Sequence, residues 1–153
     1  MPLPLRTLGS TGCQVTALGL GGVCWNLVEE DDVAIGVVHR AIDLGITYLD
    51  TASGYKDSER KLGLALKDRD RDGLFVATKC IKRSGDDVKR EIAQSFDDLG
   101  IETIDLINGG FVHDGSFFDV GSADVEKGGR TQNAHLSRLS KGPRKCFEGR
   151  RPG

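Results

Sequence analysis

The first 108 residues of the chain alternate between two hydrophobic patterns, one typical of short buried strands and one typical of amphipathic helices. Residues 46–50, 74–79 and 104–107 are short runs rich in apolar, β-branched and aromatic side chains, which predicts strands. Before and between these runs, apolar side chains recur every three or four positions, which predicts helices. The predicted buried faces are Val33, Val37, Val38, Ala41 and Ile42 in a first helix, Leu62, Ala65 and Leu66 in a second, and Val88, Ile92, Phe96 and Leu99 in a third.

Polar residues and glycines mark where these helices begin and end. Asp31 and Asp86 place negative charge at the positive end of the helix dipole, and Ser58 is predicted to cap the second helix. Gly45 and Gly100 follow the last apolar positions of the first and third helices. Glycine readily adopts the left-handed backbone conformation that stops a helix, so both ends are well marked.

The predicted strands begin near residues 46, 74 and 104, so successive strands start 28 and 30 residues apart. That interval suits a strand followed by a crossover helix, the connection that parallel strands require. Upstream, residues 3–8 and 14–18 flank a turn-forming GSTG segment and predict a β-hairpin, and residues 17–21 predict one more short strand. We therefore expect an α/β fold, with a β-hairpin followed by parallel strands that helices cover.

The regular pattern stops after Asn108. Residues 109–153 contain nine glycines and eight lysines or arginines, and no sustained apolar period. We therefore divide the chain into a patterned unit, residues 1–108, and a tail, residues 109–153, that we expect to be irregular and poorly ordered. A basic arm for an anionic partner is the alternative for the tail, although short basic tails are more often simply solvated.

Composition narrows the class of protein further. Lys and Arg number 21 against 23 Asp and Glu, so the overall charge favours neither nucleic acid nor an anionic membrane as a partner. No apolar run approaches the ~20 residues of a membrane span, and no secretory signal is visible. The four cysteines form no C-x-x-C pair, so we expect reduced thiols in a cytoplasmic protein, and no metal site.

Three side chains with useful chemistry lie at the ends of two neighbouring predicted strands or in the loop after one of them. In a parallel α/β barrel, reactive groups lie at the carboxyl ends of strands, a rule that selects Asp50, Tyr55 and Lys79. A free phenol has a pKa of ~10, too high for an efficient acid at neutral pH, but a nearby ammonium lowers it and a carboxylate holds the ammonium in place. The three together predict a device that donates a proton to a carbonyl oxygen. Each residue alone also has a structural interpretation. Asp50 could cap the turn that follows it, Tyr55 could be a half-buried aromatic of the loop, and Lys79 could form an ion pair at the mouth of the barrel.

Four segments carry a family resemblance. Residues 45–63 (GITYLDTASGYKDSERKLG) resemble the signature of the aldo-keto reductase family, in which a strand ends in Asp-Thr-Ala and a tyrosine follows five residues after the aspartate. Residues 75–79 (FVATK) resemble the family's lysine strand. Residues 6–22 resemble its N-terminal hairpin and first barrel strand, and residues 95–106 (SFDDLGIETIDL) resemble its third helix and fourth strand. The resemblance extends from residue 5 to about residue 107.

This resemblance implies a (β/α)8 TIM-barrel fold, present here as a partial barrel, and an NAD(P)H-dependent oxidoreductase that reduces aldehyde, ketone or sugar carbonyls. Tyr55 is then the general acid, Lys79 and Asp50 tune it, and Asp50 also lies beside the nicotinamide ribose. The cofactor is NADP(H), with NAD(H) as the alternative. Trp25 either lines the substrate pocket or simply packs. A Rossmann-type dehydrogenase is not favoured, because Gly-x-Gly-Gly at residues 19–22 is not its phosphate-binding loop.

The family's catalytic histidine is displaced in this sequence. Counting from Asp105 places Gly110 where the family has histidine, and His113 comes three residues later. Side chains alternate along a strand, so an odd shift turns the residue to the opposite face. Either a bulge at Gly109–Gly110 returns His113 to the site, or His113 does not take part. His39 and His135 are poor substitutes, since one is predicted mid-helix and the other in the tail.

Length is the second departure from the family. A (β/α)8 barrel needs ~250 residues, and this chain supplies the hairpin and four strands. We therefore expect a truncated or frame-shifted form with open sheet edges. The alternative to an active reductase is a non-catalytic remnant or interaction fragment that self-associates through those edges.

Overall fold

The computed structural model describes residues 2–82, 85–109 and 137–140 of the chain. An antiparallel hairpin begins the structure, as the sequence predicts. It is formed by β1 (Leu5–Thr7) and β2 (Gln14–Thr16), which the 3₁₀ turn η1 (Gly9–Thr11) connects. Gly12 follows the turn with a φ of 72°, a conformation that glycine adopts without steric cost.

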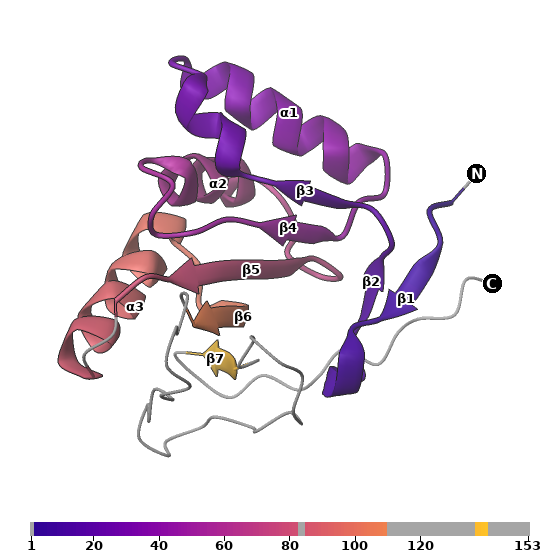
Figure 1. Ribbon diagram of the computed structural model, residues 1–153. Coiled ribbons are helices and arrows are strands. Elements are labelled where there is room, and N and C mark those ends of the chain that lie inside the picture. The colour runs from indigo at the N-terminus through magenta and orange to yellow at the C-terminus, as the bar shows by residue number, and fades with distance from the viewer. Residues whose placement is uncertain (1, 83–84, 110–136, 141–153) are drawn as a thin grey trace.

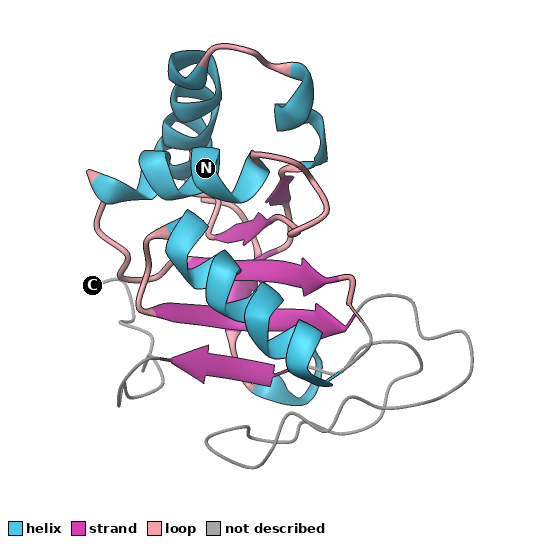
Figure 2. Ribbon diagram, turned by 90° about the vertical axis from the view of Figure 1, so that its left-hand side faces the viewer, coloured by secondary structure: helices cyan, strands magenta, loops and turns pink. Residues whose placement is uncertain are grey.

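A single sheet forms the centre of the molecule (Figure 1), and its strands lie in the order β3-β4-β5-β6-β7. They are β3 (Gly19–Gly21), β4 (Tyr48–Asp50), β5 (Phe75–Cys80), β6 (Thr103–Gly109) and β7 (Ser137–Ser140). The first four are parallel in chain order, which confirms the predicted α/β topology. Strand β7 runs antiparallel to β6, and Figure 2 shows its arrow pointing the opposite way. It is a strand within the segment that we predicted to be irregular, and the remainder of that segment lies outside the described residues.

Helices connect the parallel strands and pack on one face of the sheet, where α3 crosses the strands in Figure 2. They are the 3₁₀ segment η2 (Val23–Leu27), α1 (Asp31–Asp43), α2 (Ser58–Lys67) and α3 (Gly85–Leu99). Gly45 and Gly100 follow α1 and α3 with φ values of 88° and 61°, so both predicted helix stops are confirmed.

Two details of the helices differ from the sequence predictions. Val33 and Val37 of α1 are 52% and 44% exposed, and the buried residues of this helix are Ala34, Val38 and Ala41. Apolar residues occur on more than one side of α1, so periodicity alone does not decide which stripe meets the core. Ser58 does not cap α2, because Asp57 holds the cap position. The Ser58 hydroxyl instead lies 2.7 Å from Thr51 Oγ1 and 3.0 Å from the Gly22 carbonyl oxygen.

The two faces of the sheet carry separate apolar clusters, because alternate residues of a strand point to opposite sides. On the outer face, under the helices, Leu49 and Val76 pack with Leu62 and Leu99, and all four are fully buried. On the inner face a smaller cluster packs beneath the hairpin, and its buried members are Val15, Phe75, Ala77 and Leu106.

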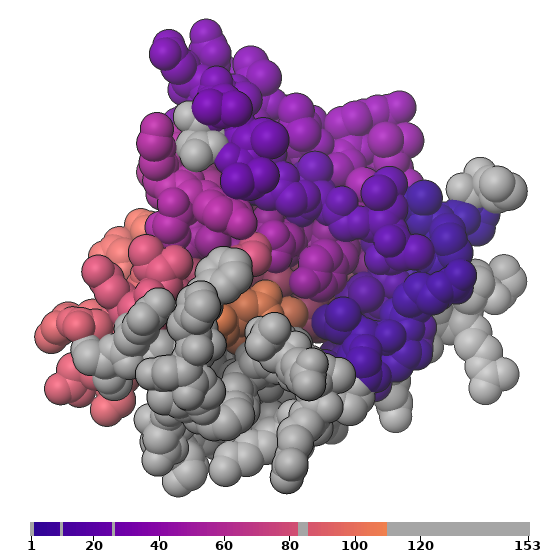
Figure 3. All heavy atoms as spheres, viewed as in Figure 1, coloured from indigo at the N-terminus to yellow at the C-terminus, as the bar shows by residue number. Residues whose placement is uncertain are grey.

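The hairpin closes the amino ends of the strands. Thr16 and Thr47 exchange hydrogen bonds, each backbone N–H donating to the other residue's hydroxyl oxygen at 3.0 Å. The space-filling view shows the hairpin residues, in indigo, lying against later residues of the chain, in purple (Figure 3). None of the described helices is both long enough and apolar enough to cross a membrane.

Candidate active site

An ion pair joins the carboxyl ends of two neighbouring strands. Asp50 is the last residue of β4 and pairs in register with Ala77 of β5, and Lys79 follows two residues later on the same face. The Lys79 ammonium donates to Asp50 Oδ2 at 2.6 Å and to the Thr51 carbonyl oxygen at 3.1 Å. The two side chains keep 31% and 27% of their surface exposed, so the pair lies at the open end of the sheet.

Tyr55 joins this pair from the loop between β4 and α2. The Lys79 ammonium lies 5.1 Å from the centre of the Tyr55 ring, within the range of a cation–π contact. The loop is held against β5 by backbone hydrogen bonds from Thr51 to Ala77 at 2.8 Å and from Ser53 to Lys79 at 3.1 Å. The chain turns sharply after Tyr55, since Lys56 has a φ of 51°.

The structure therefore brings together the carboxylate, the phenol and the ammonium that the sequence selected. An ammonium fixed by a carboxylate is charged and oriented, and a phenol within its field is a suitable proton donor to a bound carbonyl oxygen. The parts assigned to Asp50, Tyr55 and Lys79 in such a reaction remain predictions.

Of the other two predicted site residues, one is described and lies in the core. Trp25 is 4% exposed and belongs to the outer core cluster, and its predicted role at a substrate pocket stays a prediction. His113 lies outside the described residues, as does His135. His39 has a structural contact, because its Nε2 atom lies 2.9 Å from the Ala65 carbonyl oxygen.

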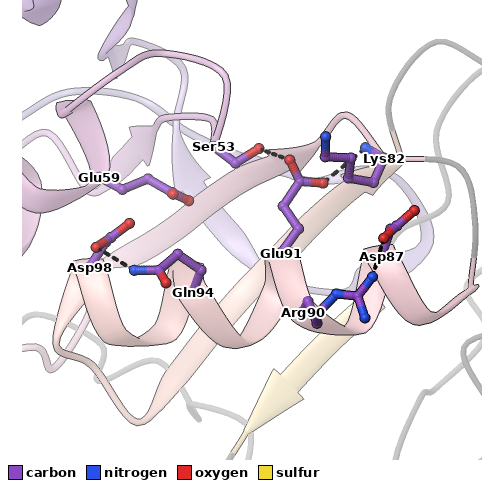
Figure 4. A pocket seen from close by; sticks show the side chains of 8 residues that line it. All are labelled: Ser53, Glu59, Lys82, Asp87, Arg90, Glu91, Gln94 and Asp98. Carbon is purple, nitrogen blue, oxygen red and sulfur yellow. Dashed lines mark hydrogen bonds and ion pairs between the residues drawn. The ribbon is translucent and has the colours of Figure 1, made fainter.

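Two hollows flank the candidate site. One, of about 580 Å³, lies on the inner face between the hairpin and the sheet, and Tyr48 and Asp50 are among its lining residues. The other, of about 380 Å³, lies beside α3 and is drawn in Figure 4. Its lining residues are Ser53, Glu59, Lys82, Asp87, Arg90, Glu91, Gln94 and Asp98.

Two carboxylates of the hollow beside α3 were missed by the sequence analysis. Glu59 is 3% exposed and accepts a hydrogen bond from the Thr78 hydroxyl at 2.6 Å. Glu91 accepts hydrogen bonds from Ser53 and from the chain that follows Lys79. One signal in the sequence was available for Glu91, since it lies three residues after Val88 and one before Ile92, within the apolar stripe of α3.

The environment shifts the acidity of these groups in different directions. Burial raises the pKa of the Glu59 carboxyl, and the hydrogen bonds that it accepts offset this only in part. Burial also acts to raise the pKa of Glu91, but its hydrogen bonds outweigh burial and the net pKa is below the ordinary value. Burial and the neighbouring Glu91 raise the pKa of the Cys80 thiol to about 12. In the described part of the chain, no group of three or more His, Cys, Asp or Glu residues is placed to hold a metal ion.

Comparisons with known proteins agree on one family. The model of the Aldo/keto reductase family matches residues 17–113. L-galactose dehydrogenase of Arabidopsis thaliana is 35% identical over 120 residues, which cover 69% of this chain and 37% of that protein. NADH-specific methylglyoxal reductase of Escherichia coli K12 is 31% identical over 127 residues, which cover 65% of this chain and 39% of that protein.

A solved structure gives the same result. The aldo-keto reductase AKR2E4 of Bombyx mori, in complex with NADP, superimposes with a TM-score of 0.59 at 28% sequence identity. The match covers 70% of this chain and 38% of that one. The chain therefore spans about two fifths of the length of the proteins that it matches.

Proposed function

Since the chain belongs to the aldo/keto reductase family, we propose that it serves the reduction of a small aldehyde, ketone or sugar carbonyl, with Tyr55 as proton donor. Its parallel strands and helices form part of the family's (β/α)8 barrel. The observation that carries the proposal is the Lys79 ammonium, which lies 2.6 Å from Asp50 and 5.1 Å from the centre of the Tyr55 ring. In this arrangement Tyr55 donates its phenolic proton to the carbonyl oxygen in reduction and accepts it back in oxidation.

For the hydride we propose NADP(H), with NAD(H) as the alternative. The Bombyx mori structure is in complex with NADP, whereas the Escherichia coli relative is named NADH-specific. When bound, the nicotinamide supplies the hydride that reduces the carbonyl carbon. Asp50 suits the nicotinamide ribose, because Gly21 stands beside it in β3 and a Cβ at Gly21 would meet nothing within 4 Å. The carboxylate thus has open space next to it for a ligand.

Two further assignments belong to the same proposal. We assign the structural unit to residues 1–108, and we assign Trp25 to the wall of the substrate pocket. His113 enters the site only if a bulge at Gly109–Gly110 restores its orientation. Substitution of His113 by alanine tests this, because a lowered kcat with an unchanged fold supports its presence in the site.

The chain's two tyrosines provide a matched test of the proton donor. Carbonyl reduction is followed through NADPH absorbance with a small dicarbonyl as substrate. Tyr55→Phe is expected to lower kcat by at least about 100-fold, the range that general acid catalysis contributes. Tyr48→Phe is the control, since this ring stacks on Phe75, with 5.5 Å between the ring centres, and has no part in the proposed proton transfer. Equal rates for the wild type and Tyr55→Phe would overturn the assignment.

The second candidate is a non-catalytic fragment that self-associates. One observation favours it: β3 has only one neighbouring strand among the described residues, which leaves a sheet edge open. Such a chain would bind no NADPH up to millimolar concentration by fluorescence titration, and it would sediment as a dimer or larger. Tight binding of NADPH by a monomer favours the reductase.

A further inference from the structure

Glu91 of α3 holds two separate loops with one carboxylate (Figure 4). Its Oε1 atom accepts a hydrogen bond from the Ser53 hydroxyl at 2.7 Å. Its Oε2 atom accepts from the backbone N–H groups of Ile81 at 3.0 Å and Lys82 at 2.9 Å, and also from the Cys80 thiol. Four donors thus converge on a single half-buried side chain.

These donors come from the two segments that carry the proposed acid and its ammonium. Ser53 lies two residues before Tyr55 in the loop after β4, and Cys80 follows directly on Lys79. Ser53 also contacts β5 directly: its N–H donates to the Lys79 carbonyl oxygen at 3.1 Å, and its hydroxyl oxygen lies 2.9 Å from the same carbonyl oxygen. The one hydroxyl proton is therefore shared between that carbonyl and Glu91. Glu91 thus adds a second attachment between the Tyr55 loop and the chain that follows Lys79.

The charge of Glu91 strengthens this arrangement. Oε2 receives three donors and must be an acceptor, whereas the Ser53 hydroxyl beside Oε1 shares its one proton with the Lys79 carbonyl oxygen. Hydrogen bonds to a charged acceptor are roughly twice as strong as neutral ones, and they keep the pKa of Glu91 below its ordinary value despite burial. A glutamine has the same size but carries no charge and has a single acceptor atom, so its hydrogen bonds to the two segments are weaker than those of the carboxylate.

We infer that Glu91 is a positioning residue, which fixes the loop of Tyr55 against the strand end of Lys79 through Ser53 on one side and Cys80, Ile81 and Lys82 on the other. The inference rests on the proposed function for its purpose, but the geometry can be tested without activity. The competing explanation is that Glu91 merely stabilises the whole fold.

Amide hydrogen exchange of the full chain, followed by NMR, separates these explanations. Glu91→Gln is expected to accelerate exchange at least about tenfold at Ser53, Ile81 and Lys82, and to leave Leu49 and Val76 in the sheet core as protected as in the wild type. Asp86→Asn is the matched control, because it removes the same charge from the same helix at a position whose side chain is 86% exposed. Unchanged exchange at all three amides, or equal acceleration in the sheet core, would overturn the inference.

Cys80 provides a second measurement at the same place. Its thiol is 4% exposed and has a pKa of about 12 while it donates to Glu91. Since the thiolate is the reactive form, alkylation at Cys80 is expected to be at least about tenfold faster in Glu91→Gln than in the wild type. Peptide mass spectrometry distinguishes Cys80 from the other cysteines. Labelling of Cys80 at the wild-type rate would contradict the inference.

Turnover links Glu91 to the reaction. Glu91→Gln and Ser53→Ala are each expected to lower kcat about tenfold with the KM for nucleotide within twofold, and the double variant is expected to be no slower than the single ones. Additive losses would show that the two side chains act separately, which contradicts the inference. A wild-type chain without turnover would overturn the proposed function instead, and the exchange and labelling results would still decide whether Glu91 holds the loops.

Discussion

The two faces of the sheet differ in what their side chains do. The outer face is sealed by three helices, and residues such as Leu49, Val76 and Leu62 have no exposed surface there. The inner face carries only a small apolar cluster beneath the hairpin, with a hollow of about 580 Å³ beside it. The ion pair of Asp50 and Lys79 lies on this second face, at the carboxyl ends of the strands.

Within one sheet, the residues that stabilise the fold and the residues of the candidate site therefore lie on opposite faces. A strand that alternates sides can place Val76 in the helix-covered core and Lys79, three residues later, in an open site. The helix-covered face then holds the larger apolar cluster, while the inner face keeps polar groups near solvent. Substitutions on the two faces should therefore have different consequences, and so should substitutions of buried residues in the helix layer and of residues at its surface or in the loops of the site.

The largest difference is expected between two leucines. Leu62→Ala removes a fully buried side chain from the outer core and should lower the free energy of unfolding by about 3 kcal/mol, because a cavity remains. Leu8→Ala, on the partly buried hairpin beside the inner hollow, should cost less than about 1 kcal/mol. Urea denaturation measures both. Equal losses would mean that the inner cluster contributes as much to stability as the helix layer.

Substitution of a buried lysine of α2 is expected to give the next largest loss in the free energy of unfolding. Lys61 is 2% exposed and donates to the carbonyl oxygens of Trp25, at 3.1 Å, and Val28. Lys61→Met keeps the volume but leaves both acceptors without their donor, so we expect a loss of about 2 kcal/mol. Its neighbour Arg60, 45% exposed and paired with Asp31, is the control: Arg60→Met should cost less than about 0.5 kcal/mol, since exposed ion pairs are screened. Thermal unfolding of both variants measures the difference.

The order of elements was predictable because it depends on local signals. Glycines at 45 and 100 stop α1 and α3 in the left-handed conformation, and each strand appears as a short apolar run. The proximity of two candidate site residues was predictable for a related reason. The carboxyl ends of parallel neighbours meet at one edge of a sheet, so Asp50 and Lys79 had to lie close together.

What the sequence did not reveal depends on contacts between distant segments. Nothing near Ser58 indicates that its hydroxyl contacts Thr51 and Gly22 rather than capping its own helix. Likewise, Val33 and Val37 fit the helical period as well as the residues that are buried, and only packing against α2 and the sheet decides between them. Glu91 finds its donors 9 to 38 residues away, a separation that no local pattern encodes.

Two substitutions that involve glycine compare the helix layer with the loop of the site. One removes a glycine and the other introduces one, and both are expected to raise the free energy of unfolding. Gly36 lies in the exposed interior of α1, and a Cβ there would meet nothing within 4 Å, so Gly36→Ala should add about 0.5–1 kcal/mol. Lys56, beside Tyr55, has a φ of 51°, and Lys56→Gly should add about 0.5 kcal/mol by relieving this strain. Melting temperatures test both. A Lys56→Gly variant less stable than the wild type would show that the site loop is unstrained.

The final comparison is between Glu59, deep under the helices, and Glu91, at the loops of the site. Burial raises the pKa of Glu59, so the native state binds more protons than the unfolded state just above the ordinary value, and stability falls as pH rises through this range. For Glu91 burial also raises the pKa, but hydrogen bonds from Cys80, Ser53, Lys82 and Ile81 reverse the net direction. Its contribution is therefore complete above the ordinary pKa and is lost as pH falls through the lowered one.

Glutamine variants isolate the two contributions, since neither can titrate. Between pH 3.5 and 7, the stability of Glu59→Gln relative to the wild type should improve as pH rises, whereas that of Glu91→Gln should deteriorate. The free energy of unfolding from urea titrations at each pH gives both slopes. Opposite slopes would mean that the helix layer tolerates Glu59 at a cost to stability while the site depends on Glu91 in its charged form. Parallel slopes would mean that the hydrogen bonds from the loops of the site do not outweigh burial at Glu91, and the two carboxylates of this hollow would then respond alike to pH.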